Sequence, residues 1–377
     1  MQRTPFTVRL YCGALVGLVA AFSFASLIAM TFKHAEISIS EKRELTQLPA
    51  WPRTVAQWDS FPERFDAYFN DNFGLRKLLL RLNSNFTTVM LGRSPSDKVV
   101  FGKDDWLFYA GDNSIELYRN QRPFSTLQLA NTEAALALRM RPLQEAHRPY
   151  LFVVVPDKHT IYPEMMPSFM SRRDPPSQFD QVVALAEAAR LPVLDLRSTL
   201  RQGKADGQVY LKDDSHWTDW GAYLGYRRIM AALPLTDLPV LDLDATKFAI
   251  PSDHAGDLAG MAGLTRRETT RLSEVPAERC AFTATAYQSV GDDISIGRTF
   301  CPQAKYKIMF IGDSFTGALV KYLSRSFGEV VYVARSGFKP SREIAPLIER
   351  EKPDLVIEEL AERHLDSLAD TVAQEGR

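Results

Sequence analysis

The chain has 377 residues, enough for one large domain with appendages or for two domains. Hydrophobic residues make up 45% of it and charged residues 24%, as in an ordinary globular protein. The net charge of -1 excludes bulk electrostatic attraction to nucleic acid, and no basic stripe offsets it.

The first predicted element is a membrane span, because residues 10–32 carry no charged side chain. As a helix this run would be roughly 34 Å long, enough to cross the hydrocarbon core of a bilayer. Arg3 and Arg9 precede it, which predicts a cytoplasmic stub over 1–9 and the remaining chain outside. The alternative is a cleaved signal peptide, but the run is long for one and lacks a clear cleavage site. We therefore expect a single-pass signal anchor in the inner membrane.

Residues 33–95 are predicted to form a tether and a helical segment. Aromatic and leucine side chains recur near helical spacing, and Gly74 interrupts them, which predicts helices over 61–70 and 75–89. Apolar runs at 99–102 and 106–109 then predict a short hairpin.

From residue 96 to 377 helices alternate with apolar strands. Strands are predicted over 150–155, 193–196, 306–311, 330–333 and 355–357, and a short apolar run covers 209–211. Helices are predicted over 127–147, 181–191, 219–233, 317–327 and 342–351, with a last one after the final strand, whereas 234–305 is predicted to be irregular. Because the strands are apolar throughout, we expect an α/β domain with a mostly parallel sheet flanked by helices.

Asp214 and His216 stand two positions apart, between an apolar run and a predicted helix. A carboxylate at this spacing can fix the imidazole tautomer while the other ring nitrogen faces a substrate. One alternative is a helix N-terminus capped by Thr218. Another is a metal site built from neighbouring acids, but no second His or Cys lies at ligand spacing, so we expect no metal.

Gly312-Asp-Ser314 ends an apolar strand and offers the nucleophile that such a pair lacks. Although 98 positions separate Ser314 from His216 (314 − 216), the carboxyl ends of parallel strands share one edge of a sheet. The Ser314 amide is a candidate oxyanion donor, and Gly337 is a second candidate or simply a turn residue. Asp313 is expected to brace the turn.

Three further residues are candidates for the oxyanion or the substrate, each with a structural alternative. Lys158 follows a strand, but lysines in loops are mostly solvated. Trp217 is able to stack on a sugar ring, but packing beside the loop is at least as common for tryptophan. Arg363 is able to donate to an oxyanion, but an exposed helix arginine is the simpler interpretation.

Together these motifs resemble the SGNH hydrolase-like domain of alginate O-acetyltransferases of the AlgJ/AlgX type. The similarity extends to Phe69-Asn-Asp-Asn-Phe-Gly-Leu-Arg76, to Gly102-Lys-Asp-Asp-Trp-Leu-Phe-Tyr109, to Val155-Pro-Asp-Lys158 with Tyr162-Pro163, and to Gly256-Asp-Leu258. The Asp-x-His block precedes the serine block, which looks like a circular permutation of the usual SGNH order. The usual oxyanion asparagine has no obvious counterpart after strand 355–357.

The resemblance implies a periplasmic enzyme without a cofactor that moves acetyl groups onto an exopolysaccharide. By position, Ser314 matches its nucleophile, His216 its base and Asp214 its orienting acid. A membrane O-acyltransferase is the implied donor of the acetyl group, and the short polar tail favours an anchored, AlgJ-like layout. An acetyl esterase with the same residues, or a non-catalytic scaffold for polysaccharide export, remains the alternative.

Other cysteines and histidines complete the expectations. Cys280 and Cys301, 21 positions apart (301 − 280), are expected to form a disulfide in an oxidising compartment. The histidines outside the motif have no evident partner and are expected at the surface: His34, His147, His159, His254 and His364.

Overall fold

A computed structural model represents the chain. It describes residues 17, 20, 37–38, 43–44, 46–73, 96–174, 176–244, 247–275, 280, 283–290 and 293–375. The chain divides into two compact units, one formed by 1–96 with 260–265 and the other by 97–259 with 266–377. Each unit is described separately below.

The described part of the first unit contains one long helix, α2 (Val55–Asn72), and the pair β1 (Ile37–Ser38) and β2 (Arg43–Glu44). The helix begins earlier than predicted because Thr54 and Gln57 form a capping box that satisfies its first amides. The predicted helix over 75–89 lies outside the described residues, as does the span over 10–32 except for Gly17 and Ala20. Within the described residues, no helix combines the length and apolar character needed to cross a bilayer.

The second unit is built on an eight-stranded sheet, counted over its described residues, with strand order β10-β11-β13-β12-β14-β5-β6 and β9 paired to β11. Its strands are β5 (Tyr150–Val155), β6 (Val193–Asp195), β9 (Thr283–Ala284), β10 (Gln288–Ser289), β11 (Ile294–Phe300), β12 (Lys307–Gly312), β13 (Glu329–Arg335) and β14 (Leu355–Ala361). The run β13-β12-β14-β5-β6 is parallel, whereas β9, β10 and β11 add antiparallel pairs at one side. The predicted mostly parallel sheet is confirmed.

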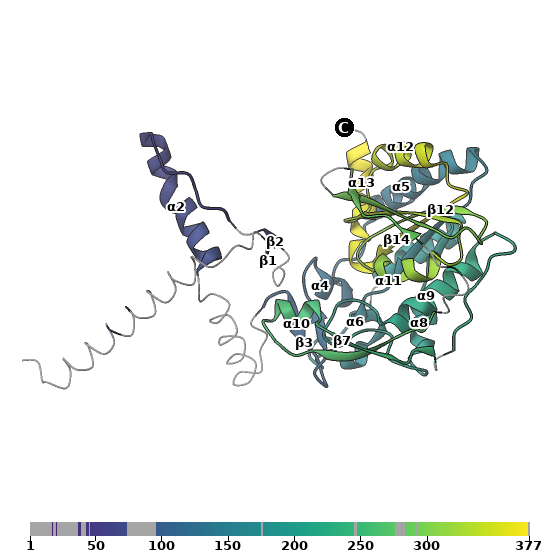
Figure 1. Cartoon of the computed structure of the whole chain (residues 1–377), viewed down its shortest axis with the longest axis horizontal. Helices are drawn as coiled ribbons and strands as arrows, with labels where there is room; N and C mark the ends of the chain where they lie inside the picture. Colours follow the sequence, from purple (N-terminus) through teal and green to yellow (C-terminus); the bar gives the residue numbers. More distant parts are fainter. Residues whose placement is uncertain are drawn as a thin grey trace, which may run out of the picture. The chain divides into compact units, whose positions relative to one another are not determined.

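Helices cover both faces of this sheet, as Figure 1 shows. One face carries α5 (Thr126–Glu145), α7 (Gln178–Ala189), α12 (Ser341–Glu351) and α13 (Asp366–Glu375), and the other carries α8 (Arg197–Gly203), α9 (Asp219–Ala232) and α11 (Thr316–Leu323). Successive residues of β5 enter opposite cores: Val153 packs with the second set of helices and Phe152 with the first. Strands buried on both faces explain the continuous apolar runs in the sequence.

Short elements complete the unit. The predicted hairpin is confirmed as β3 (Val99–Phe101) and β4 (Leu107–Tyr109). A second ribbon pairs β7 (Ile250–His254) with β8 (Glu268–Leu272). The short helices are α4 (Ser114–Tyr118), α6 (Lys158–Ile161), η1 (Pro163–Met165), α10 (Asp257–Met261) and η4 (Glu362–His364).

Two predictions about the secondary structure of the second unit were wrong. Residues 234–305 are not irregular, because they contain β7 to β11. Strand β14 also continues past residue 357, through Glu358 and Glu359 to Ala361. Glu358 is tolerated in a fully buried strand because it forms ion pairs with Arg139 at 3.2 Å and with Arg335 at 2.9 Å.

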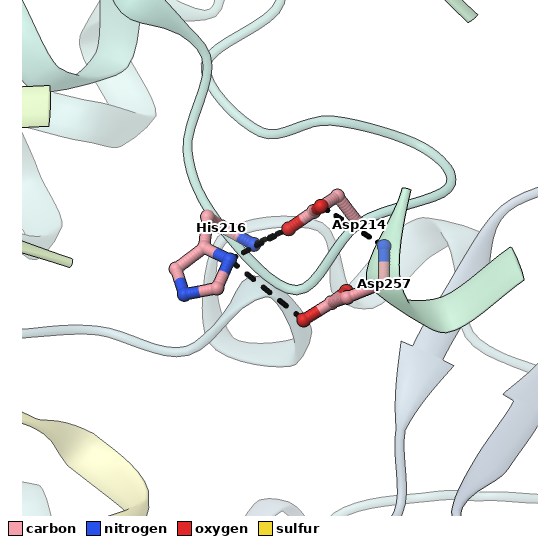
Figure 2. Close-up of side chains that lie close together, drawn as sticks. All are labelled: Asp214, His216 and Asp257. Carbon is pink, nitrogen blue, oxygen red and sulfur yellow. Dashed lines mark hydrogen bonds and ion pairs between the residues drawn. The ribbon is translucent and has the colours of Figure 1, made fainter. Parts of the chain in front are cut away.

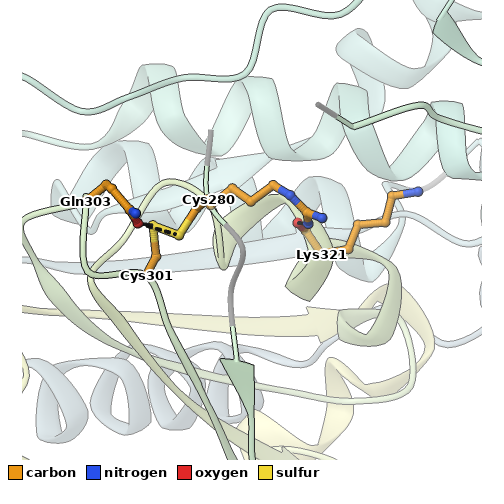
Figure 3. The surroundings of a disulfide bond; sticks show 5 residues. Cys280, Cys301, Gln303 and Lys321 are labelled. Atoms are coloured by element: carbon orange, nitrogen blue, oxygen red, sulfur yellow. Dashed lines mark hydrogen bonds between the residues drawn. A yellow bond between two sulfur atoms is a disulfide. The ribbon is translucent and has the colours of Figure 1, made fainter. Parts of the chain in front are cut away.

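A disulfide joins Cys280 to Cys301, with 5.8 Å between their Cα atoms (Figure 3). Cys301 follows β11, and its amide donates to the Gly328 carbonyl just before β13. Since β13 starts there, the disulfide lies at the amino-terminal edge of the parallel strands.

Candidate active site

The loop that carries Asp214 and His216 is the tip of a narrow hairpin. Tyr210 bridges to Trp217, the Leu211 amide donates to the His216 carbonyl at 3.1 Å, and Thr218 donates to Val209 at 3.0 Å. Thr218 also caps α9 by accepting from the Gly221 amide at 3.1 Å. The helix-cap interpretation therefore holds for Thr218 and leaves Asp214 and His216 for another role.

Asp214 holds His216 through two hydrogen bonds to one carboxylate oxygen. Its Oδ1 accepts from the His216 amide at 2.9 Å and lies 2.6 Å from His216 Nδ1. Burial opposes ionisation of Asp214, but the hydrogen bonds from His216 and His254 outweigh it and lower the pKa of the carboxyl well below its usual range. A carboxylate in this position fixes the ring with Nε2 facing outward.

The Gly312-Asp313-Ser314 turn lies at the carboxyl end of β12. A side chain at position 312 would collide with Thr316 and Glu359, so only glycine fits there. The Asp313 carboxylate accepts from the Phe315 amide at 3.0 Å and from the Ala361 amide at 2.9 Å, as expected of a residue that braces the turn. Ser314 is exposed at the tip.

The two motifs meet in space. His216 Nε2 lies 2.7 Å from Ser314 Oγ, and the Phe315 ring packs against the imidazole with centroids 4.9 Å apart. The hydroxyl, the imidazole and the carboxylate thus form one chain of hydrogen bonds. A base that accepts the serine proton and a carboxylate that stabilises the resulting imidazolium are the parts needed for nucleophilic acyl transfer.

Lys158 does not reach the exposed part of the site. It is 2% exposed, and its Nζ donates to the carbonyls of Leu211, Lys212 and Asp214 at 2.9, 3.1 and 2.6 Å. Burial lowers the pKa of its ammonium to about 7. Lys158 is therefore neither a solvated loop residue nor a residue that contacts the substrate. Instead it stabilises the catalytic loop through three backbone carbonyls.

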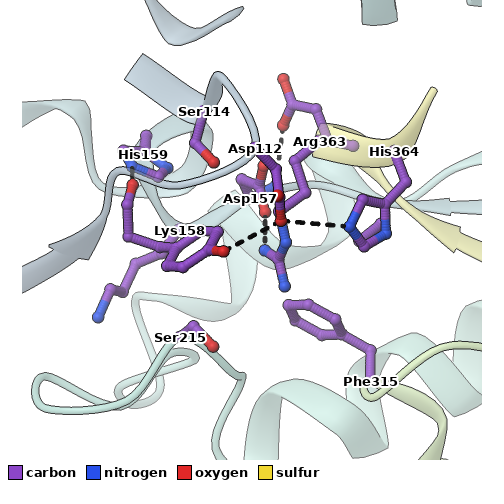
Figure 4. Close-up of polar contacts among 12 residues, drawn as sticks. Asp112, Ser114, Asp157, Lys158, His159, Ser215, Phe315, Arg363 and His364 are labelled. Carbon is purple, nitrogen blue, oxygen red and sulfur yellow. Dashed lines mark hydrogen bonds and ion pairs between the residues drawn. The ribbon is translucent and has the colours of Figure 1, made fainter. Parts of the chain in front are cut away.

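Trp217 and Arg363 are both buried. Trp217 is 3% exposed and packs edge-on against Phe315, so the packing interpretation is correct and no sugar stacks on it. Arg363 is not the exposed residue expected, because its guanidinium pairs with Asp157 and lies 5.2 Å from the Phe315 ring (Figure 4). It follows β14. Because β14 extends to Ala361 rather than ending at 357, the residues just after the strand are Glu362, Arg363 and His364.

Gly337 lies in the turn after β13 with φ of +60°, a conformation that favours glycine. Its carbonyl accepts from Arg335, whose guanidinium also binds Glu358 and the Glu359 carbonyl. The turn residue is thus tied to the buried ions of β14, at the same edge as Ser314.

Three histidines have partners that the sequence did not reveal, and one of them, His159, is also buried rather than at the surface. His254 Nε2 lies 2.9 Å from Asp214 Oδ2, and His364 Nδ1 lies 3.4 Å from Asp313 Oδ2. His159 is 2% exposed and contacts the Tyr109 carbonyl at 2.7 Å. Only spatial proximity reveals these contacts, since each partner lies on a different segment. His147 is exposed as predicted, and His34 lies outside the described residues.

Asp214, His216 and Asp257 are the group in the described chain whose ligand atoms could hold a metal, all within 4.8 Å of one another (Figure 2). These atoms already engage one another or Ser215. Asp257 accepts from the Ser215 amide and hydroxyl, both at 2.7 Å, while Nδ1 of His216 faces Asp214. The pattern is that of a hydrogen-bond relay.

The chain is similar to several known proteins. The chain is 27% identical to a Pseudomonas aeruginosa protein named "Probable alginate O-acetylase AlgJ", over 81% of this chain and 80% of that protein. The Azotobacter vinelandii protein of that name is 25% identical over 80% of this chain and 78% of its own length. The solved structure of Bacillus cereus PatB1 with a sulfonyl adduct has a TM-score of 0.51 at 16% identity, covering 71% of this chain and 95% of that chain, and shows the fold alone.

The family model for the SGNH hydrolase-like domain, acetyltransferase AlgX, matches residues 99–362. That range is more than half of the chain and contains the hairpin loop, the serine turn and the strands that position them. The chain therefore belongs to the AlgX family of SGNH hydrolase-like acetyltransferase domains.

Proposed function

We propose that this protein is an O-acetyltransferase that moves acetyl groups onto hydroxyls of an exopolysaccharide through an acetyl-Ser314 intermediate. The observation that carries the proposal is the 2.7 Å contact between Ser314 Oγ and His216 Nε2, backed by the 2.6 Å contact to Asp214. Relatives named alginate O-acetylase support acetyl as the group and an alginate-like polymer as the acceptor.

In the first step Ser314 Oγ attacks the acetyl carbonyl of a donor ester. His216 Nε2 takes the hydroxyl proton as the new C–O bond forms, and Asp214 stabilises the imidazolium. When the tetrahedral intermediate collapses, the donor's C–O bond breaks and its oxygen leaves with the proton from His216. The products are acetyl-Ser314 and the free donor alcohol.

In the second step a sugar hydroxyl attacks the acetyl-enzyme. His216 removes the hydroxyl proton, the new ester forms, and the Ser314–acetyl bond breaks with return of that proton to Oγ. Charge that develops on the carbonyl oxygen needs donors. The candidates are the Ser314 amide, the amide of Gly337 and the guanidinium of Arg363, since the usual oxyanion asparagine has no obvious counterpart after β14.

The proposed location is the periplasmic side of the inner membrane. The uncharged run over 10–32 after Arg3 and Arg9 supports a signal anchor, with 33–95 as tether and helical segment and 96–377 as catalytic domain. The Cys280–Cys301 disulfide supports an oxidising compartment. A membrane O-acyltransferase is the proposed acetyl donor, and the reversed motif order is proposed to reflect circular permutation.

The test uses the full chain in detergent, p-nitrophenyl acetate as donor and alginate oligosaccharides as acceptor. Wild type should release p-nitrophenol and add acetyl mass to the sugar, and Ser314→Ala should do neither at equal thermal stability. Ser60→Ala, on the exposed part of α2, is the matched control. Undiminished release by Ser314→Ala would contradict the proposal.

The same experiment separates the alternatives. Release of acetate without acetylated sugar identifies an acetyl esterase, because water then replaces the acceptor. Failure of Ser314 to react with a serine-directed acylating probe supports a non-catalytic scaffold.

A further inference from the structure

The β7–β8 ribbon and the residues that flank its strands contact the loop that carries the proposed base. Gly256 lies so close to the Asp213 carbonyl that any side chain at 256 would collide with it. The Asp213 amide donates to Glu268 Oε2 at 2.7 Å, and its carboxylate accepts from Arg266 Nε at 2.7 Å. The segment just before Asp214 is therefore held from several directions.

The ribbon also completes the hydrogen bonding of Asp214. Its Oδ1 faces His216, while Oδ2 accepts from the Asp257 amide at 3.0 Å and faces His254 Nε2 at 2.9 Å. A single carboxylate thus connects two imidazoles, one on each oxygen. His216 faces the serine, and His254 has a side chain 35% exposed to solvent.

The groups around His254 are acidic. Asp214 contacts it, Glu268 lies opposite it in the ribbon, and Asp257 follows three positions later. The hydrogen bond to Asp214 is the main cause that raises the pKa of His254, against a smaller opposing effect of burial. Lys158 is the nearby buried basic group: its Nζ donates to the carbonyls of the loop. Its pKa of about 7 means that it also titrates near neutral pH, in wild type and in variants at 254. The surroundings of His254 therefore favour its charged form.

We propose that His254 is a positioning residue: its Nε2–H holds the second oxygen of Asp214, and its charge sets how strongly that carboxylate supports His216. This inference rests on the proposed function and names the residue that regulates the same site. When His254 is protonated and His216 has taken the Ser314 proton, both imidazoles are charged. The single Asp214 carboxylate then has to stabilise two cations. When His254 is neutral it still donates to Asp214, but the competing charge is gone, so His216 is a stronger base.

The consequence is a rate that rises as His254 loses its proton. A glutamine at 254 keeps an N–H donor but no charge. We expect His254→Gln to lack the step that belongs to His254 and to keep a plateau within about threefold of wild type.

A leucine at 254 removes the donor as well. We expect the plateau of His254→Leu to fall about tenfold or more, the effect of losing one charge-assisted hydrogen bond, with KM for the ester unchanged. Recovery of the plateau in His254→Gln relative to His254→Leu distinguishes positioning from packing. His147→Gln, an exposed histidine elsewhere in the same unit, is the matched control.

The experiment follows acetylation of Ser314 in the full chain by p-nitrophenyl acetate, between about pH 5 and 9. Ser314→Ala is run in parallel and should be inactive. If it is inactive and the pH–rate profiles of both His254 variants coincide with those of wild type and of His147→Gln, the inference is overturned. Activity in Ser314→Ala instead defeats the proposed function itself.

A second measurement needs no activity. In an NMR titration of histidine-labelled full chain, the His254 imidazole should titrate above its ordinary value of 6.5 and return toward it in Asp214→Asn. If the titration midpoint of His254 is the same in wild type and in Asp214→Asn, the inference is overturned. This result does not depend on whether His254→Leu folds.

Discussion

The amide of Ala361 donates to the carboxylate of Asp313 at 2.9 Å, so the last residue of β14 holds the turn after β12. The two strands are neighbours in the sheet, and 48 positions separate the residues in the chain. The turn that presents Ser314 is thus fixed by the strand beside it as well as by its own backbone.

Replacement of Asp313 should therefore damage both stability and rate. In Asp313→Ala the buried amides of Phe315 and Ala361 lose their acceptor, which should lower the free energy of unfolding by about 2 kcal/mol or more. The displaced serine should acylate at least about tenfold more slowly. Urea denaturation and p-nitrophenyl acetate kinetics measure the two effects. Asp253→Asn, on an exposed position of β7, should change neither, and an unaltered acylation rate in Asp313→Ala would show that the brace is dispensable.

Much of this site could be predicted because its signals are local. Gly312-Asp-Ser314 and Asp214-Ser-His216 each sit beside an apolar run, and parallel strands bring their ends to one edge. His254 could not be found in this way. It lies 40 positions from Asp214, on a ribbon whose residues are mostly exposed and show no apolar periodicity.

The end of β14 was missed for a different physical reason. Two adjacent glutamates normally end a buried strand, because burying a charge without a partner is costly. The partners of Glu358 are Arg139 and Arg335, which come from a helix and a strand far away in sequence. These ion pairs form only in the folded chain. Because the longer β14 depends on them, the position of Arg363 just after that strand could not be predicted either.

Lys158 should prove essential for the shape of the catalytic loop although it touches no substrate. Lys158→Met keeps the buried stem but leaves the carbonyls of Leu211, Lys212 and Asp214 without their donor. We expect the acylation rate to fall about tenfold or more with KM for p-nitrophenyl acetate unchanged. Lys103→Met is the matched control, since exposed Lys103 also binds a carbonyl, that of Glu164. Equal rates in the two variants would argue against a role for Lys158 in the loop.

Glu362 should make stability depend on pH. Burial, together with the charge of Asp157, raises the pKa of its carboxyl from 4.5 to about 7. Because the folded value exceeds the unfolded one, its contribution is full below pH 4.5 and is lost as pH rises through about 7. The loss should be on the order of 3 kcal/mol in the free energy of unfolding.

Glu362→Gln cannot ionise, so this part of the pH dependence should vanish. Urea denaturation at about pH 5 and about pH 7.5 gives the difference in unfolding free energy for each variant. Wild type and the exposed control Glu133→Gln should lose stability between the two, and Glu362→Gln should lose less. Equal losses in all three proteins would mean that Glu362 is ionised throughout.

The Cys280–Cys301 disulfide should affect stability without affecting chemistry. It closes a loop with a sequence separation of 21, which should contribute about 3 kcal/mol by restricting the unfolded chain. It lies at the amino-terminal edge of the parallel strands, whereas Ser314 lies at their carboxyl edge. The double variant Cys280→Ser/Cys301→Ser should therefore unfold at lower urea but acylate at the wild-type rate. Wild type treated with dithiothreitol should match it, and the variant itself should not respond to reductant. A slower acylation in the double variant would instead show that strain at one edge of the sheet reaches the serine turn at the other.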